Sequence, residues 1–82
     1  MNIQQVMSIC YELTTKGIRY SLDFNEVKRA FYMFISCRTP EQFEEIYKIV
    51  SFVDFTDVKA DEEELILECE NGFVKLEKWW TA

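Results

Sequence analysis

The side chains best placed to do chemistry are the carboxylates of one acidic stretch. Between Asp54 and Glu70 the only basic residue is Lys59, so this stretch carries a net charge of −7. Its eight acids are Asp54, Asp57, Asp61, Glu62, Glu63, Glu64, Glu68 and Glu70. Carboxylates at this density attract basic protein surfaces and repel nucleic acid and anionic membranes. Because so many acids adjoin one another, their pattern singles out no general acid and no general base.

Neither these acids nor the cysteines indicate a metal site. An EF-hand loop that began at Asp57 would need an acid at its third position and glycine at its sixth, where the chain has Lys59 and Glu62. Histidine is absent, and the three cysteines are far apart in the chain, at Cys10, Cys37 and Cys69. The residues needed for a zinc site or for a catalytic thiolate–histidine pair are therefore missing. We expect no metal, no cofactor and no enzymatic activity.

Composition indicates one small domain, residues 1–82, of the α+β class. Hydrophobic residues make up 49% of the 82 and aromatic residues 16%, which is too apolar for a disordered chain. The net charge of −6 is uneven, because residues 1–40 carry +2 and residues 41–82 carry −8. The longest apolar run, residues 30–35, is too short to span a membrane, and the first residues do not resemble a signal peptide. We expect a cytoplasmic protein with no membrane partner.

Two amphipathic helices are expected to position these side chains. In the first, over residues 3–16, Asn2 and Gln5 form a capping box and Gly17 suits the position after the last turn. Its buried stripe is predicted to be Ile3, Val6, Met7, Cys10 and Leu13. The second helix begins after the N-cap Thr39, with Pro40 at its first position, and ends near residues 51–52. Its buried stripe is predicted to be Phe43, Ile46, Tyr47 and Val50.

Two strands are expected between the helices. Residues 18–24 alternate between apolar and polar, which predicts a half-buried strand with Ile18, Tyr20, Leu22 and Phe24 on its inner face. Residues 27–37 fit a strand or a helix, and we favour a strand because the run is short and aromatic. Such a strand is apolar on both faces, which is typical of a central strand. If only one side is covered, Tyr32 and Phe34 form an exposed contact surface and a candidate oligomer contact.

The C-terminal part predicts an antiparallel meander. A two-residue turn at Asn71-Gly72 would make paired positions sum to 143, so that Glu68 faces Lys75. A shorter strand at residues 55–59 precedes this hairpin. The same alternation places Trp80 with the core residues and leaves Trp79 on the more exposed side. The predicted order is therefore α-β-β-α-β-β-β, with a single-layer sheet packed by two helices.

These features favour a non-catalytic protein-interaction domain. The acidic stretch, with Trp79 as an aromatic anchor, would occupy a basic surface of a larger protein, because carboxylates held on a rigid sheet can stand in for phosphates. An inhibitor that covers a nucleic-acid-binding surface would act in this way. In size and acidity the chain resembles the small inhibitor proteins made by phages and other mobile elements.

Two alternatives remain open from the sequence. The first is a homodimeric or complex-assembly domain without nucleic-acid mimicry, whose interface contains Tyr32, Phe34 and Trp79. The second is a binder of RNA or single strands, whose basic and aromatic residues are Arg19, Tyr20, Lys28 and Arg29. The net charge of −6 disfavours direct binding of nucleic acid.

Overall fold

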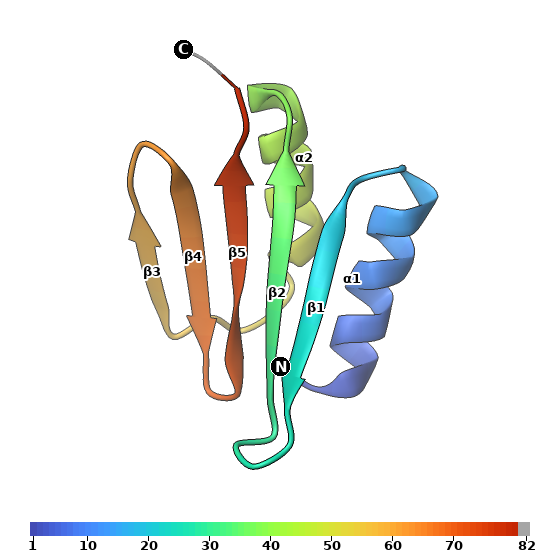
Figure 1. Cartoon of the computed structure of the whole chain (residues 1–82), viewed down its shortest axis with the longest axis vertical. Coiled ribbons are helices and arrows are strands. Elements are labelled where there is room, and N and C mark those ends of the chain that lie inside the picture. The colour runs from blue at the N-terminus through green and yellow to red at the C-terminus, as the bar shows by residue number, and fades with distance from the viewer. Residues whose placement is uncertain (81–82) are drawn as a thin grey trace.

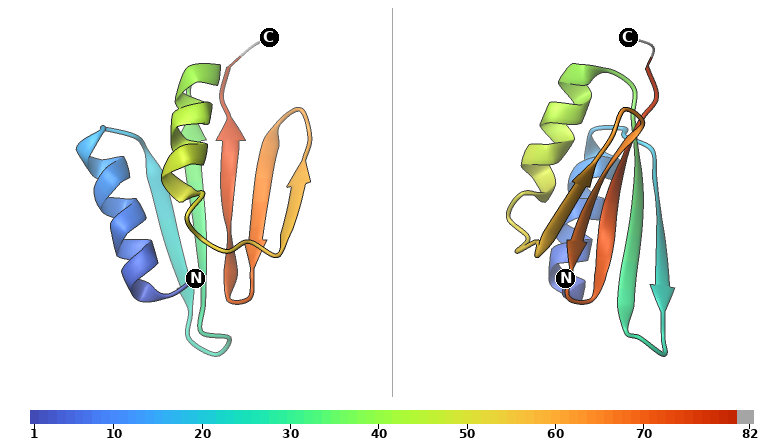
Figure 2. Two further views of the ribbon diagram at one scale, coloured as in Figure 1. Left: turned by 180° about the vertical axis from the view of Figure 1, so that it is seen from behind. Right: turned by 90° about the vertical axis from the view of Figure 1, so that its left-hand side faces the viewer.

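A five-stranded sheet carries both helices on one of its faces (Figures 1 and 2). The computed structural model describes residues 1–80. The elements in chain order are α1 (Ile3–Thr15), β1 (Tyr20–Asn25), β2 (Ala30–Cys37), α2 (Pro40–Val50), β3 (Asp57–Ala60), β4 (Glu64–Cys69) and β5 (Gly72–Lys78). The predicted α+β order and the single sheet with two helices are confirmed. Within residues 1–80 neither helix is long and apolar enough to cross a membrane.

The sheet is mixed, with the strand order β1-β2-β5-β4-β3. The β1–β2, β3–β4 and β4–β5 pairs are antiparallel, which confirms the predicted hairpin and meander. The pattern of the sequence did not reveal how these two units join. In the structure β5 runs parallel to β2, and α2 lies in the connection between the two strands and packs against both. The strand prediction for residues 27–37 is confirmed over residues 30–37, whereas residues 27–29 belong to the β1–β2 turn, and β2 is a central strand.

Both helices begin as the sequence predicts. Asn2 and Gln5 form the reciprocal capping box of α1, and the Thr39 side chain accepts a hydrogen bond from the Gln42 backbone N–H at the start of α2. Gly17 follows α1 with a positive φ of 69°. These helix ends could be predicted because each depends only on residues within one turn of the chain.

Each predicted buried stripe is partly wrong. In α1 the buried residues are Val6, Ile9 and Leu13, whereas Ile3 and Met7 are largely exposed. The reason is that Ile3 and Met7 lie on the flank of α1 that turns away from α2. In α2 the predicted core residue Tyr47 is exposed, because with Pro40, Phe43, Ala60 and Leu65 it lines a shallow groove between α2 and the β3–β4 hairpin.

The hydrophobic core lies between the helices and one face of the central strands. Its fully buried strand residues are Met33, Ile35, Cys37, Leu67, Val74 and Leu76. The predicted inner face of the first strand is less buried than expected, because Leu22 is 38% exposed and Phe24 is 50% exposed. Phe24 lies on the edge strand β1 and packs against Phe31 of β2, with ring centroids 4.8 Å apart.

The register predicted for the last hairpin is wrong by two residues. Cys69 pairs with Gly72 and Glu68 pairs with Phe73, so the loop is Glu70-Asn71 and β5 begins at Gly72. Gly72 is placed by its parallel contact with Phe31 of β2, where an added Cβ would overlap the Phe31 carbonyl oxygen. A shift of two residues keeps every side chain on its predicted face. The strand β3 begins two residues later than the predicted strand at 55–59.

The buried thiol of Cys37 gives a first testable prediction. Loss of hydration by burial, and secondarily the charge of Glu77, raise the pKa of Cys37 from 9.0 to about 12. We expect Cys37 to react with a thiol reagent only after unfolding, whereas the half-buried Cys10 and Cys69 react in the folded protein. A thiol assay in buffer and in denaturant measures this difference. A single common rate for all three thiols in buffer would contradict it.

The same shift predicts a loss of stability at alkaline pH. Since the folded pKa of Cys37 is the higher one, its contribution is complete below pH 9 and is lost as the pH rises from 9 towards 12. The slope is at most about 1.4 kcal/mol per pH unit. Denaturant unfolding of Cys37→Ala at several pH values should show a shallower decline than the unsubstituted protein.

Candidate functional site

In the part of the chain that the structure describes, one whole face of the sheet is not covered by a helix. Figure 2 shows α1 and α2 on the same side of the strands. Side chains on the opposite side follow the register, in which Tyr32 adjoins Phe73 and Phe34 adjoins Lys75. We call this surface the open face. Its strand residues include Asp23, Tyr32, Phe34, Asp57, Lys59, Glu64, Ile66, Glu68, Phe73, Lys75 and Glu77.

Three aromatic rings form the centre of the open face. Phe73 packs on Tyr32 with ring centroids 4.9 Å apart and meets Phe34 edge to face at 5.5 Å. The ammonium group of Lys75 lies 5.5 Å from the centroid of the Phe34 ring. Each aromatic pair contributes about 0.5–1.5 kcal/mol beyond the area it buries. The three rings are only half-buried, so part of each ring is exposed to solvent.

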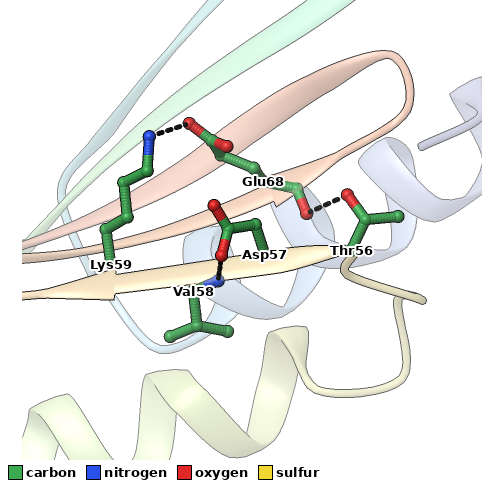
Figure 3. Close-up of polar contacts among 5 residues, drawn as sticks. All are labelled: Thr56, Asp57, Val58, Lys59 and Glu68. Atoms are coloured by element: carbon green, nitrogen blue, oxygen red, sulfur yellow. Dashed lines mark hydrogen bonds and ion pairs between the residues drawn. The ribbon is translucent and has the colours of Figure 1, made fainter.

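Carboxylates lie around these rings, and two of them form ion pairs. Glu64 lies 3.6 Å from the Lys75 ammonium, and Glu68 lies 3.3 Å from the Lys59 ammonium (Figure 3). Asp57 projects on the same side as Lys59, while Val58 points to the other side. The strand residues of the open face comprise five acids and two lysines, a net charge of −3. These partly exposed ion pairs add little stability.

Trp79 extends the open face at one end. The Trp79 backbone N–H donates to the Cys37 carbonyl at 2.8 Å, so the backbone at Trp79 is anchored to β2. Its largely exposed side chain borders a hollow with Glu63, Glu64 and Glu77. The predicted exposure of Trp79 is confirmed. The prediction for Trp80 is also confirmed, because Trp80 packs against the core and contacts Phe43.

Hydrogen bonds to its first residue, Asp61, shape the turn between β3 and β4. The Asp61 carboxylate accepts hydrogen bonds from the backbone N–H groups of Glu63 at 2.7 Å and Glu64 at 2.9 Å. These two bonds, and then the nearby Lys78 and Lys75, hold the pKa of Asp61 below its usual value. The Asp61 carboxylate is therefore used within the turn. The side chains of Glu62 and Glu63 are exposed to solvent.

The eight acids of the acidic stretch do not form one surface. Asp57, Glu64 and Glu68 lie on the open face, and Glu63 joins them beside Trp79. The other four lie in loops: Asp61 and Glu62 are in the β3–β4 turn, Glu70 is in the β4–β5 turn at the opposite end of the hairpin, and Asp54 precedes β3 (Figure 1). The structure brings the first group together with Tyr32 and Phe34, which the sequence suggested for a different interface.

The residues considered for nucleic-acid binding do not form one surface, although Lys28 borders a hollow with the open-face rings of Tyr32 and Phe73. Tyr20 lies on the helix-covered side, where its hydroxyl is 3.1 Å from the Thr14 hydroxyl. Lys28 and Arg29 lie in the β1–β2 turn, and Arg19 precedes β1. The aromatic rings that could stack bases lie among five acids and two lysines, and this excess of negative charge is unfavourable for phosphate.

Sequence reasoning did not select Phe73, Ile66 or Glu77 as functional residues. The alternation of the last hairpin already placed all three on the side away from Val74 and Leu76. Their importance follows from the parallel pairing of β5 with β2, which puts Phe73 between Tyr32 and Phe34. No local pattern signals that contact.

Neither metal ligation nor similarity to other proteins adds a function. In the described part of the chain, no three histidine, cysteine or acidic side chains are placed to hold a metal ion. Comparison with known proteins finds no matching family model, no matching curated protein and no matching solved structure. The function has to be inferred from the open face itself.

Proposed function

We propose that this protein is a non-catalytic interaction domain that binds a basic surface of a larger protein through the open face. One observation carries the proposal: an uncovered five-stranded face holds a packed aromatic cluster among carboxylates, two of which form ion pairs. Where the partner uses that basic surface to bind nucleic acid, the domain acts as its inhibitor.

The two kinds of side chain have different tasks in binding. The carboxylates raise the rate of encounter with a cationic surface, and the gain falls as salt rises. The rings of Tyr32, Phe34 and Phe73 bury apolar area at the centre of the contact and slow dissociation. Trp79 adds a further anchor at one end. Because strands hold these groups in place, little conformational entropy is lost on binding.

The charge of the open face argues against the two alternatives. A dimer through Tyr32 and Phe34 would bring together two surfaces of net charge −3, which repel each other. Nucleic acid is repelled for the same reason. A cationic protein surface is the partner that this charge favours. All three cysteines carry free thiols, which supports action in a reducing cytoplasm.

The proposal predicts that neutralising the open face weakens binding. The partner is first captured from the native host and identified by mass spectrometry. The variant Glu64→Gln/Glu68→Gln/Glu77→Gln should then bind that partner on the order of tenfold or more weakly than the unsubstituted protein, with a shallower salt dependence. Titration calorimetry at several salt concentrations measures both quantities.

A matched control separates the open face from bulk charge. The variant Glu12→Gln/Glu41→Gln/Glu44→Gln removes the same three charges from the helices, so it should bind within about twofold of the unsubstituted protein. Equal losses in both variants would show that only total charge matters and would overturn the proposal. Capture of nucleic acid in place of a protein would also overturn it.

A further inference from the structure

The edge strand β1 presents unpaired backbone groups to solvent. Within residues 1–80 only β2 adjoins it in the sheet, and the Arg19 carbonyl accepts from the Ser36 N–H at 3.0 Å. In an antiparallel pair, alternate residues direct both backbone groups to the neighbouring strand. The backbone N–H and C=O groups of Ser21 and Asp23 therefore point towards β2. The backbone groups of Tyr20, Leu22 and Phe24 point outwards, away from the sheet.

The strand β1 has few of the features that protect edge strands from pairing, because Asp23 is its one charged residue. It has no proline and no lysine, its register with β2 is continuous, and Leu22 and Phe24 on it are exposed. The opposite edge, β3, has only four residues and includes Asp57 and Lys59. One edge of the sheet is therefore protected by charge and shortness, and the other is open.

The helix α1 adds apolar side chains to the same edge. Ile3, Met7 and Tyr11 recur every four residues and are 54%, 63% and 71% exposed. Thr14, which continues this flank, contacts Tyr20 of β1. The opposite flank of α1 faces α2, to which Lys16 is joined by an ion pair with Glu45. The exposed apolar flank thus borders β1.

We infer that a second copy of this chain pairs with β1 through a two-fold axis. In the register that we propose, the axis passes beside Ser21, and Tyr20 exchanges backbone hydrogen bonds with the partner's Leu22. On the open-face side, Arg19 then stands opposite the partner's Asp23, and the symmetry repeats this ion pair. The occupant is a second copy because the edge is complementary to itself in charge and in hydrogen bonding.

Neighbouring registers are less favourable. Shifting the axis to Leu22 places Asp23 opposite the partner's Ser21 and loses both ion pairs. Shifting it to Asp23 brings two carboxylates together. The interface also lies in the part of the chain that carries +2, so two acidic chains meet where their repulsion is weakest. The resulting sheet carries both open faces on the same side, which would let one dimer bind a repeated partner twice.

The test measures mass against protein concentration by analytical ultracentrifugation. We expect a monomer–dimer equilibrium, which Leu22→Lys weakens on the order of tenfold or more. The control Val58→Lys places the same charge on the opposite edge and should leave the equilibrium unchanged. A monomer at every concentration, or equal effects of the two lysines, would overturn the inference.

A charge swap tests the register independently of folding. Asp23→Arg places like charges opposite each other and should weaken the dimer about tenfold, and Arg19→Asp/Asp23→Arg should restore it. A double variant that dimerises no better than the single one would refute this register. The open-face variant Glu64→Gln/Glu68→Gln/Glu77→Gln should keep the dimer mass, so failure here is distinguishable from failure of the proposed function.

Discussion

Replacing Gly72 with alanine is expected to lower the free energy of unfolding by roughly 3 kcal/mol or more. Gly72 has a φ of +128°, which L side chains rarely adopt, and an added Cβ would overlap the Phe31 carbonyl oxygen. Phe31 belongs to β2, which β1 holds in place from the other side. The overlap can therefore be relieved only by opening the β2–β5 pairing. Urea unfolding followed by tryptophan fluorescence measures the loss.

Gly17 provides the matched control for this substitution. Its φ is also positive, at 69°, but an added Cβ there meets no atom within 4 Å. Gly17→Ala should therefore cost only the strain of a left-handed residue, about 1 kcal/mol. If the two alanine variants lost equal stability, backbone conformation alone would explain Gly72 and the close contact with β2 would be unimportant.

The elements that sequence reasoning predicted well are those fixed by near neighbours. The Asn2 and Thr39 caps, Gly17 after α1 and the strand character of residues 30–37 each depend on a few adjacent residues. The two faces of the last hairpin were also predictable, because alternation has a period of two and survives a register shift of two.

The errors all involve contacts between segments distant in sequence. Asn71-Gly72 has the composition of a two-residue turn, but Gly72 is needed where β5 meets β2. The alternation of β1 predicts a buried face, yet Leu22 is exposed because no strand lies beyond it in residues 1–80. The local patterns of a single sequence do not show which strands become neighbours. The role of Gly72 and the exposure of Leu22 could therefore not be predicted from them.

The candidate site was predictable in its parts and not in its assembly. The sequence suggested acids with Trp79 for one interface and Tyr32 with Phe34 for another. The parallel β2–β5 contact unites members of both groups on one face and adds Phe73 at its centre. The same topology sends Glu70 and Asp54 elsewhere, because both lie in loops outside the strands. A prediction from proximity in the chain therefore assigned too many residues to the acidic surface and too few to the aromatic one.

The neighbours Phe34 and Ile35 are expected to separate binding from folding. They project from β2 to opposite sides, so Phe34 is on the open face and Ile35 is fully buried in the core. Ile35→Ala should cost about 2–5 kcal/mol of stability, because it leaves a cavity. Phe34→Ala loses one aromatic pair and should cost about 1 kcal/mol. Urea unfolding of both variants measures this difference.

Binding should show the reverse order. Phe34→Ala removes an anchor from the proposed contact and should raise the Kd for the captured partner roughly thirtyfold, equivalent to about 2 kcal/mol. Ile35→Ala, measured at a temperature where it is folded, should bind almost normally, and Ile35→Val serves if alanine prevents folding. Phe34→Ala with unchanged affinity would remove the aromatic cluster from the interface. Equal loss of affinity in both variants would mean that binding reports the integrity of the fold and not the open face.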